Sequence, residues 1–391
     1  PLKKWLNLLL GWRGQIIPIY QVKILPLMEV LLVSEKTIIV KSHKGKYSAT
    51  FCKNGVKHLV KNLPNKNFHI IIDKKVAHLY EDELKFILDN SSVLLIEAIE
   101  SNKSLEAIPR YVSHLVNRQI RRDDILIAIG GGIIQDITCF LAATLLRGVD
   151  WYFYPTTLLA QADSCIGSKS SINCGDSKNL LGTFTPPDKV IIGSNFLKTL
   201  DGVDVRSGVG EMLKVHGISG EKDFNKIANK YNDLFIDSSI MQVFIRRSLE
   251  IKKKYIEADE FDRGPRNIFN YGHSFGHAIE AATNFAIPHG IAVTIGLDMA
   301  NWLSPQIASG DVQHYDRMHG VLSRNYRGFK KIEIPIDLFM SALAKDKKNI
   351  GKDEVTLILP NKYAKIEKGR YVNNKIFKSL CDKYLTKVRT S

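Results

Sequence analysis

The segment Asp123–Leu146, DDILIAIGGGIIQDITCFLAATLL, constrains the fold more than any other part of the chain. Its run ILIAI is continuously apolar, which is typical of a strand that is buried on both faces. Three adjacent glycines, Gly130–Gly132, follow this run, and the residues after them have apolar side chains at helical spacing. The order of strand, glycine turn and helix predicts one βα unit of a parallel sheet.

Strands and helices alternate around this unit. From Lys36 onward the runs KTIIVKS, KYSATF, NFHIIID and SSVLLIEAIE read as strands, and SLEAIPRYVSHLVNRQI reads as a helix. Such alternation predicts a parallel sheet that is covered by helices on both faces. From about Val203 the segments become long and amphipathic, and they predict helices.

These patterns predict an α/β N-terminal nucleotide-binding domain with a parallel sheet, followed by a mainly α-helical C-terminal domain. We expect an N-terminal extension over residues 1–35, the nucleotide-binding domain over 36–200 and the helical domain over 201–391. A chain of 391 residues is long enough for two domains with substantial cores.

The formal charge of +15 leaves three kinds of partner open: nucleic acid, an anionic membrane surface or an anionic small molecule. Many of the lysines lie in amphipathic runs such as SLEIKKKYIEADEF. No helix-turn-helix, zinc-finger or aromatic RNA-binding signature accompanies them. We therefore expect an anionic small-molecule substrate and no nucleic-acid partner.

The cysteines and the apolar runs indicate the cellular compartment in which the protein is expected. Five cysteines are spread along the chain without a CxxC pair, so neither a disulfide framework nor a cysteine zinc site is expected. No run reaches the roughly 20 apolar residues of a membrane span. We expect a cytoplasmic protein, and we leave a homodimer open.

Three histidines and one glutamate form a candidate metal set. His273 and His277 are four residues apart in FNYGHSFGHAIE, so they share one face of a helix, as zinc-binding histidines do. Glu211 and Lys214 share a helical face in GVGEMLKVHG, and a surface ion pair is the alternative reading. His289 in IPHG supplies a further imidazole. One carboxylate and two imidazoles are a recurrent catalytic zinc set, whereas each histidine alone is explained as well by packing.

The glycine turn is a candidate cofactor site. Glycines after a strand let backbone amides approach a pyrophosphate at the N-terminus of a helix. Three adjacent glycines are not the spaced GxGxxG pattern, so a plain tight turn remains an alternative. Asp73 ends an earlier strand, where an acid can hold a ribose hydroxyl.

A polar segment, ADSCIGSKSSINCGDSKNLLG, is too rich in glycine and charge for a core element. It is either a solvated connection or part of a pocket for an anionic, hydroxylated ligand. Its polar members could join others from distant parts of the chain to form a basic pocket; the full set is Asp163, Lys169, Lys178, Asn179, Arg147, Lys252, Arg266, Asn270 and the DKK segment Asp346–Lys348.

Several of these segments together resemble the sugar phosphate cyclases, and among them the 3-dehydroquinate synthases most closely. The resemblance rests on GGGIIQDITCFLAATLLRGVDWYFYPTTLLAQADSCIGSKSSINCGDSKNLLGTF, GVGEMLKVHG and RNIFNYGHSFGHAIEAATNFAIPHGIAVTIGLDMAN. It extends in order from about Lys36 to the DKK segment. It implies the dehydroquinate synthase fold, with an NAD-binding α/β domain, a helical metal-binding domain and the active site between them.

The resemblance also implies roles for individual residues. The implied ligands of a divalent ion, Zn²⁺ or Co²⁺, are Glu211, His273 and His289. The implied NAD-binding residues are Asp73, Glu100, Lys103, Gly131, Gly132, Asp136, Thr156, Thr157 and Lys178. The implied catalytic and substrate-binding residues are His277, Lys169, Lys214, Arg147, Lys252, Arg266, Asn270, Asp163, Asn179 and Lys347.

The implied reaction is a lyase reaction without net redox change. In this family NAD transiently oxidises a ring hydroxyl, phosphate leaves by elimination, the hydride returns, and an intramolecular aldol reaction closes a carbocycle. The divalent ion acts on the hydroxyl, and lysine and arginine side chains hold the phosphate and the carboxylate. The implied substrate is an anionic sugar phosphate.

Three positions depart from the family pattern. GSK at Gly167–Lys169 replaces GGK, Ile291 replaces a glutamate after His-Gly, and Lys75 replaces an asparagine near Asp73. The rest of the set favours 3-deoxy-D-arabino-heptulosonate 7-phosphate as the substrate. Another sugar phosphate cyclase of specialised carbohydrate metabolism, a metal-dependent alcohol dehydrogenase and a non-catalytic basic binding module are the alternatives.

Overall fold

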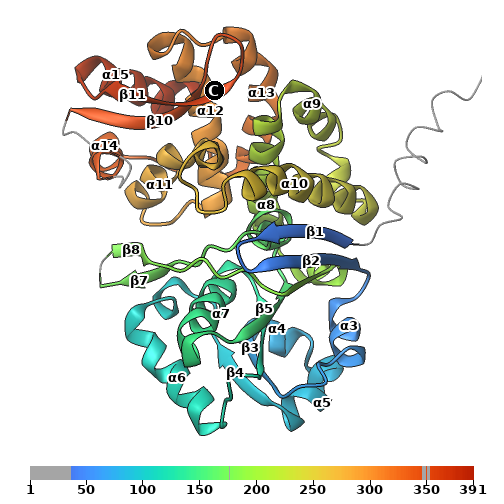
Figure 1. Cartoon of the computed structure of the whole chain (residues 1–391). Helices are drawn as coiled ribbons and strands as arrows, with labels where there is room; N and C mark the ends of the chain where they lie inside the picture. Colours follow the sequence, from blue (N-terminus) through green and yellow to red (C-terminus); the bar gives the residue numbers. More distant parts are fainter. Residues whose placement is uncertain (1–36, 176, 346–348, 350–352) are drawn as a thin grey trace, which may run out of the picture. The chain divides into compact units, whose positions relative to one another are not determined.

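The computed structural model describes residues 37–175, 177–345, 349 and 353–391, and a seven-stranded sheet is central to the first half of this range (Figure 1). The strand order is β1 (Thr37–Ser42), β2 (Gly45–Cys52), β9 (Lys189–Gly193), β6 (Asp150–Pro155), β5 (Ile125–Gly130), β3 (Phe68–Asp73) and β4 (Ser92–Ile96). Only β1 and β2 pair antiparallel within this sheet. The predicted parallel sheet is confirmed, and the extension predicted over 1–35 lies outside the described residues.

Helices cover both faces of the sheet, and β5 shows why its sequence has no polar alternation. Leu126 and Ala128 belong to one buried cluster, which includes side chains from α6 (Ile108–Asn117) and α7 (Gly132–Thr144). Ile127 and Ile129 belong to a second cluster, which includes side chains from α3 (Gly55–Lys61), α4 (Lys74–Leu79) and α5 (Glu81–Asn90). A strand between two apolar layers needs apolar side chains at every position.

The second half is mainly helical, as predicted. Its longer helices are α8 (Gly202–Ser219), α9 (Glu221–Asn229), α10 (Ser238–Ala258), α11 (His273–Ala282), α12 (His289–Ile307), α13 (Val312–Asn325), α14 (Ile336–Ala344) and α15 (Lys375–Lys383). Among the helices in the described ranges, none has the length and apolar character needed to cross a membrane. Residues 37–391 form one compact unit, so the division at 200/201 stays a prediction.

Two hairpins were not predicted. One pairs β7 (Ile172–Cys174) with β8 (Ser177–Leu181) inside the segment that was expected to be a loop. The other pairs β10 (Glu354–Pro360) with β11 (Ile366–Val372) inside the helical half. The π-helical turn η4 (Ala160–Ser164) precedes the first hairpin, and the short turns η1 (Glu100–Asn102), η3 (Leu145–Arg147) and η7 (Pro265–Asn270) also carry site residues.

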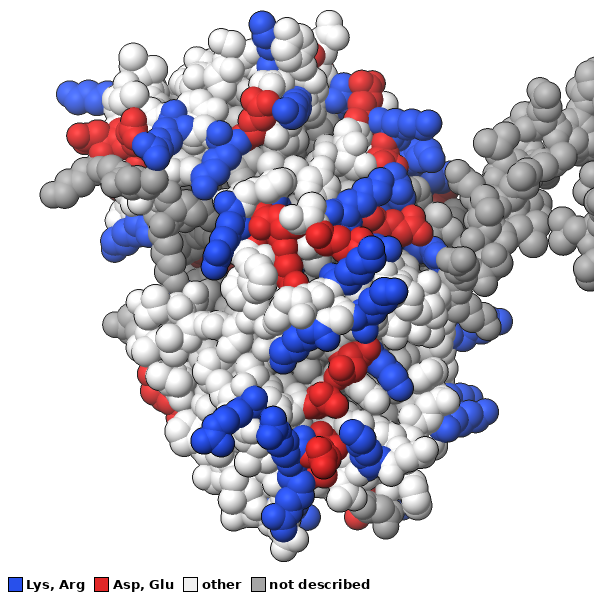
Figure 2. All heavy atoms as spheres, in the orientation of Figure 1, with Lys and Arg blue, Asp and Glu red and all other residues white. Residues whose placement is uncertain are grey.

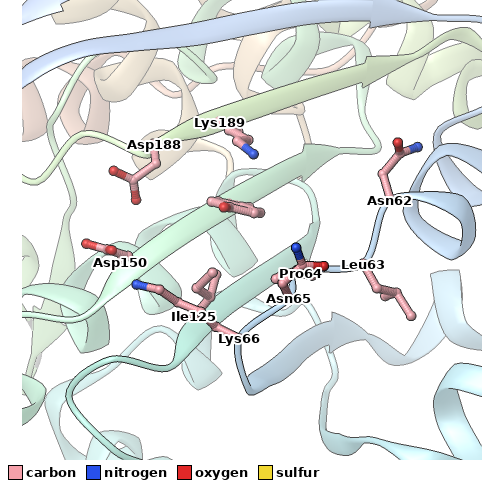
Figure 3. A pocket seen from close by; sticks show the side chains of 10 residues that line it. Asn62, Leu63, Pro64, Asn65, Lys66, Ile125, Asp150, Asp188 and Lys189 are labelled. Carbon is pink, nitrogen blue, oxygen red and sulfur yellow. The ribbon is translucent and has the colours of Figure 1, made fainter.

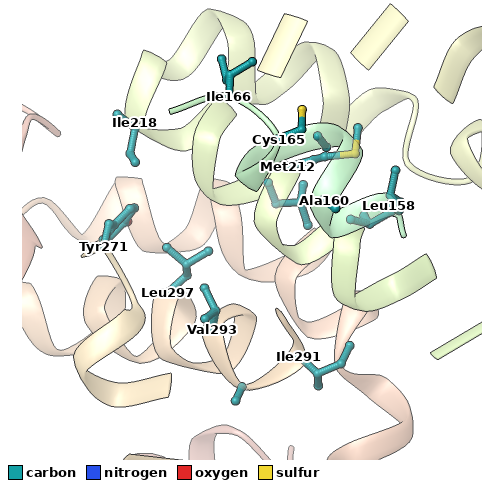
Figure 4. Close-up of a cluster of buried hydrophobic side chains, with 14 of the residues drawn as sticks. Leu158, Ala160, Cys165, Ile166, Met212, Ile218, Tyr271, Ile291, Val293 and Leu297 are labelled. Atoms are coloured by element: carbon teal, nitrogen blue, oxygen red, sulfur yellow. The ribbon is translucent and has the colours of Figure 1, made fainter. Parts of the chain in front are cut away.

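A dense core connects the helices of the second half to η4. Figure 4 shows Leu158 and Cys165 near Met212 of α8, with Val293 and Leu297 of α12 in the same cluster. Glycines bring the backbones of these helices close together. A Cβ on Gly210 of α8 would collide with the carbonyl oxygen of Gly290 on α12. These contacts fix α8 and α12 as rigid supports for the residues beside the glycines.

The contact between α11 and α12 depends on Gly296 in the same way. A Cβ on Gly296 would collide with the carbonyl oxygen of Gly272, which precedes α11. We expect Gly296→Ala to lower the free energy of unfolding by about 1–3 kcal/mol, because backbone must move to make room for the methyl group. Urea unfolding followed by circular dichroism would measure the change.

Gly320→Ala is the matched control. Gly320 lies on α13, and a Cβ there would meet nothing within 4 Å. This exchange should stabilise the protein by about 0.5–1 kcal/mol, since alanine favours the helix over glycine. Equal stabilities for the two variants would contradict the close approach of α11 and α12.

Candidate functional site

Glu211, His273 and His289 lie close together, although they come from three helices. Each offers one ligand atom, and these atoms all lie within 4.8 Å of one another. Glu211 is on α8, and the two histidines are the first residues of α11 and α12. The Oε1 atom of Glu211 lies 3.7 Å from Nε2 of His273 and 3.4 Å from Nε2 of His289.

The residues fit a tetrahedral divalent ion. Ligand atoms at about 2.0–2.1 Å from such an ion are about 3.4 Å apart, which is close to the two distances from Glu211. The carboxylate of Glu211 is buried. Lys214 lies 2.5 Å from Oε2, whereas Oε1 faces the two imidazoles and accepts no hydrogen bond of regular geometry among the described residues. A buried carboxylate oxygen requires a partner, and a cation between these three side chains would supply one for Oε1.

The glycines described above explain the position of each candidate ligand. Gly210 precedes Glu211, Gly290 follows His289, and Gly272 precedes His273. Each of these glycines lies where two helical segments approach too closely for a Cβ. The packing of these helices therefore sets the distances between the backbone positions of the three candidate ligands.

A network of buried charges extends from the other oxygen of Glu211. The Nζ atom of Lys214 lies 2.5 Å from Oε2 of Glu211 and 3.1 Å from Oδ2 of Asp163. Lys252, on α10, places its Nζ atom 2.7 Å from Oδ1 of Asp163. The surface ion pair that was the alternative reading for Glu211 and Lys214 is wrong, because both side chains are only 2% exposed.

The network shifts the pKa values of its members. Burial alone would raise the pKa of Asp163, but the ammonium groups of Lys214 and Lys252 outweigh burial, and its pKa is lowered. Burial opposes the charge of Lys214, but Asp163 and Glu211 outweigh that effect and raise its pKa. For Lys252 burial prevails over Asp163, and its pKa is lowered. Lys252 is thus the less well compensated of the two lysines.

Further predicted substrate residues surround this network. Arg266 is buried and donates from Nη1 to the carbonyl of Glu260 at 2.6 Å. Asn270 ends η7, three residues before His273. The ring of His277 lies 5.4 Å from that of His273 and 5.6 Å from that of His289, measured between centroids. His277 therefore belongs to the same cluster, on its exposed side.

The glycine turn fits the pyrophosphate of a dinucleotide. Gly131 is the N-cap of α7 and makes no side-chain cap, so the first amides of this helix remain available to an anion. A Cβ on Gly131 would lie 2.9 Å from the Cγ2 atom of Thr157. A Cβ on Gly132 would meet no described atom within 4 Å. Thr156 donates its backbone N–H to Gly130, which brings the end of β6 beside the turn.

Lys103 connects three of the other predicted cofactor and substrate residues. Its buried Nζ atom lies 3.3 Å from Glu100, 3.2 Å from Asp136 and 2.9 Å from the side-chain oxygen of Asn179. Asp73 ends β3 and accepts a hydrogen bond from the N–H of Lys75, which caps α4. Asp73 ends β3, Glu100 and Lys103 follow β4, and Asp136 lies on the helix that follows β5, which is the side of the sheet where doubly wound folds bind nucleotides.

Two predicted residues lie on exposed parts of the same region. Lys169 forms an ion pair with Asp262. Lys178, on β8, places its Nζ atom 3.4 Å from the ring centroid of Phe285, in the loop between α11 and α12.

Arg147 is not grouped with these residues. It ends η3, just beyond the C-terminus of α7 and close to the first residue of β6. The glycine turn is at the other end of α7, about 20 Å away for a 13-residue helix. Its role stays a prediction, and Lys347 lies outside the described residues.

A surface hollow of about 410 Å³ lies at the other end of the strands, beside their first residues (Figure 3). Its lining includes Ile125, Asp150 and Lys189, the first residues of β5, β6 and β9. Ligands of doubly wound sheets bind at the carboxyl ends of the strands. This hollow is therefore separate from the candidate site.

The sequence reasoning missed three residues that contact the predicted set: Glu280, Asp262 and Phe285. The side chain of Glu280 lies 3.0 Å from Nδ1 of His289. Its spacing of seven residues after His273 places it on the face of α11 that carries both histidines, and this spacing was a usable signal. Asp262 and Phe285 lie outside the helices and strands, where no periodicity was available.

Comparisons with known proteins identify the family of the chain. Residues 93–207 match the family model described as 3-dehydroquinate synthase N-terminal, and residues 208–349 match 3-dehydroquinate synthase C-terminal. A 3-dehydroquinate synthase of Clostridium tetani (strain Massachusetts / E88) is 37% identical over 75% of this chain and 79% of its own length. That of Pelagibacter ubique (strain HTCC1062) is 34% identical over 89% of this chain and 98% of its own length.

Solved structures show the same fold. The crystal structure of a 2-deoxy-scyllo-inosose synthase, complexed with carbaglucose-6-phosphate, NAD⁺ and Co²⁺, superposes with a TM-score of 0.79 at 20% identity. The superposition covers 90% of this chain and 99% of that one. The sequence matches and the fold together show that the chain belongs to the 3-dehydroquinate synthase family.

Proposed function

We propose that the chain converts 3-deoxy-D-arabino-heptulosonate 7-phosphate into 3-dehydroquinate and phosphate, with NAD and a divalent ion, Zn²⁺ or Co²⁺, as cofactors. The observation that carries the proposal is the convergence of Glu211, His273 and His289 beside the buried Lys214. This arrangement combines a metal-binding set with cations that suit an anionic substrate.

The residues present suit both cofactors. Bound NAD would accept and return a hydride, and the divalent ion would act as a Lewis acid toward a substrate hydroxyl. Glu211, His273 and His289 would hold the ion. Gly131 and Gly132 would receive the pyrophosphate at the N-terminus of α7, and Asp73, Glu100, Lys103, Asp136, Thr156, Thr157 and Lys178 would complete the NAD site.

The chain's own cations would orient the substrate. Lys214 and Lys252 are buried and held apart by Asp163, so their ammonium groups are fixed before the substrate arrives. Fixed cations in a site with little water attract a carboxylate and a phosphate more strongly than mobile surface lysines do. Arg266, Lys169, Asn179 and Asn270 would extend this binding surface, and His277 would transfer a proton.

The alternative of another sugar phosphate cyclase rests on Ser168 and Ile291. Ile291, on α12, is fully buried and belongs to the hydrophobic core (Figure 4). Its side chain is therefore part of the packing and is not available to select a substrate. Ser168 is also buried and lies next to Lys169, so it is the remaining departure that could affect specificity.

The face shown in Figure 2 favours a small substrate over a nucleic acid. In the face shown in Figure 2, lysine and arginine side chains lie among acidic ones and do not form a continuous basic track. A phosphate backbone is usually followed by such a track. The five cysteines are free thiols, which supports our proposal of a cytoplasmic location. A homodimer stays a prediction, and light scattering would test it.

The test uses the full chain with NAD and Zn²⁺. The heptulosonate phosphate, a sedoheptulose 7-phosphate and glucose 6-phosphate are supplied separately, and released phosphate is measured. We expect release with the heptulosonate phosphate and no accumulation of reduced nicotinamide. Release only with another sugar phosphate would establish the alternative cyclase, and reduced nicotinamide rising with turnover would establish a dehydrogenase.

A further inference from the structure

We propose that Glu280 is a positioning residue for the metal site: its carboxylate accepts the Nδ1 proton of His289 and holds that imidazole with Nε2 toward Glu211. This inference rests on the metal set of the proposed function and extends it by one residue.

The imidazole of His289 lies between two carboxylates. Its Nδ1 atom is 3.0 Å from Oε2 of Glu280, and its Nε2 atom is 3.4 Å from Oε1 of Glu211. A carboxylate can only accept at Nδ1, so the proton of a neutral ring resides there and the lone pair of Nε2 faces Glu211. This is the tautomer that a metal ligand requires.

His273 has the same orientation with a different outer partner. Its Nδ1 atom lies 3.3 Å from the backbone carbonyl of Tyr271, and its Nε2 atom also faces Glu211. The two imidazoles thus direct the same nitrogen inward. His273 is oriented by a neutral carbonyl, whereas His289 is oriented by a charged carboxylate, which strengthens its basicity as a ligand.

The backbone around Glu280 is well suited to hold this contact. Glu280 lies on α11 and its side chain is 13% exposed, while His289 is the first residue of α12. Gly276 of α11 packs against the backbone of Val293 on α12. The carboxylate and the imidazole are therefore carried by two helices in close backbone contact, so the side chains need little rearrangement to stay together.

A second group of side chains could also hold a metal ion. His277, Glu280 and His289 also offer ligand atoms within 4.8 Å of one another, and in that grouping Glu280 would bind the ion itself. We favour the first set because the buried Oε1 atom of Glu211 faces both imidazoles and has no hydrogen-bonded partner of regular geometry among the described residues, whereas Glu280 is already paired with His289.

The experiment measures the affinity of the full chain for Zn²⁺ by competition with a chromophoric chelator, and the visible spectrum of the Co²⁺-loaded protein. The variants are Glu280→Gln, which keeps an oxygen acceptor, Glu280→Ala, which removes it, and Glu211→Gln as the ligand-loss reference. Circular dichroism verifies folding. Loss of an outer partner of a metal-bound histidine typically weakens metal binding about 10–100-fold.

We expect Glu280→Ala to weaken Zn²⁺ binding by about 10–100-fold and Glu280→Gln to restore part of that loss. The Co²⁺ spectrum of both variants should retain the wild-type band pattern, because the ligands themselves are unchanged. Unchanged affinity in Glu280→Ala would overturn the inference. So would loss of metal as complete as in Glu211→Gln with an altered spectrum, since Glu280 would then be a ligand. Failure of the wild-type chain to bind Zn²⁺ would instead refute the metal set of the proposed function.

Discussion

Glu211→Gln should release the divalent ion and abolish turnover. The side chain is 2% exposed, and Oε1 is the atom that faces both imidazoles. Glutamine has nearly the same shape but lacks the negative charge that compensates the ion. Loss of a partner outside the ligand shell costs about 10–100-fold in metal affinity, so loss of a charged ligand should cost on the order of 10³-fold or more. Elemental analysis after dialysis and a phosphate-release assay would measure the two effects.

Two variants serve as controls for this result. Glu221→Gln removes a carboxylate from the exposed start of α9, where the side chain is 62% exposed, and should leave metal content and turnover unchanged. His277→Ala removes an imidazole from the cluster without removing one of the three ligands. It should retain the ion and slow turnover. Metal retention by Glu211→Gln, or metal loss in His277→Ala, would contradict the ligand assignment.

The helices that carry this site could be predicted because their apolar faces repeat. β5 and α7 follow from a continuous apolar run and a glycine turn, and Gly131 and Gly132 stand at the start of α7 as expected. The spacings of Glu211 with Lys214 and of His273 with His277 placed each pair on one helix. Local periodicity determines such pairs.

The convergence of those helices could not be derived from periodicity. The packing of α8 against α12 depends on glycines whose importance is visible only when Gly210 meets the carbonyl of Gly290. Sequence reasoning reached the three-ligand set through a family resemblance. That route supplied the residue types but missed Glu280, which the resemblance did not include.

The two hairpins were not predicted because their strands lack a diagnostic sequence pattern. Ser177–Leu181 is largely exposed on both faces, so β8 lacks the alternation of a half-buried strand. Glu354–Pro360 is almost entirely buried, and a short apolar run of this kind does not distinguish a strand from a buried helical segment. Arg147 was assigned to the site by a sequence match. Such a match does not indicate that Arg147 and the glycine turn lie at opposite ends of α7.

Asp163→Asn should have the second largest effect, because it removes the anion between two buried ammonium groups. Lys214 retains Glu211 at 2.5 Å, but Lys252 loses its acidic partner and remains near Arg266. Breaking a buried ion pair from one side costs about 3–5 kcal/mol, because an uncompensated charge stays in a medium of low polarity. We expect a loss of that size in the free energy of unfolding near neutral pH, measured by urea unfolding, together with loss of turnover.

The matched exposed substitution is Asp233→Asn. Asp233 pairs with Lys230 at 2.9 Å, but the two side chains are 36% and 53% exposed, so the loss should be at most about 1 kcal/mol. The double variant Asp163→Asn with Lys252→Met removes the ammonium group of Lys252 together with the carboxylate of Asp163. It should recover about 1–3 kcal/mol relative to Asp163→Asn alone, since removal of both members of a buried pair costs less than removal of one.

The pH dependence provides a separate test of the same cause. Burial already lowers the pKa of Lys252, and removal of Asp163 should lower it further below the value in the unfolded chain. The unfolded state then binds more protons than the folded state between those two pKa values, so the stability of Asp163→Asn should rise with pH in that window. At about pH 9.5 its deficit relative to the wild-type protein should be smaller than near neutral pH. A deficit that stays constant with pH would mean that the loss arises from altered packing and not from a buried charge.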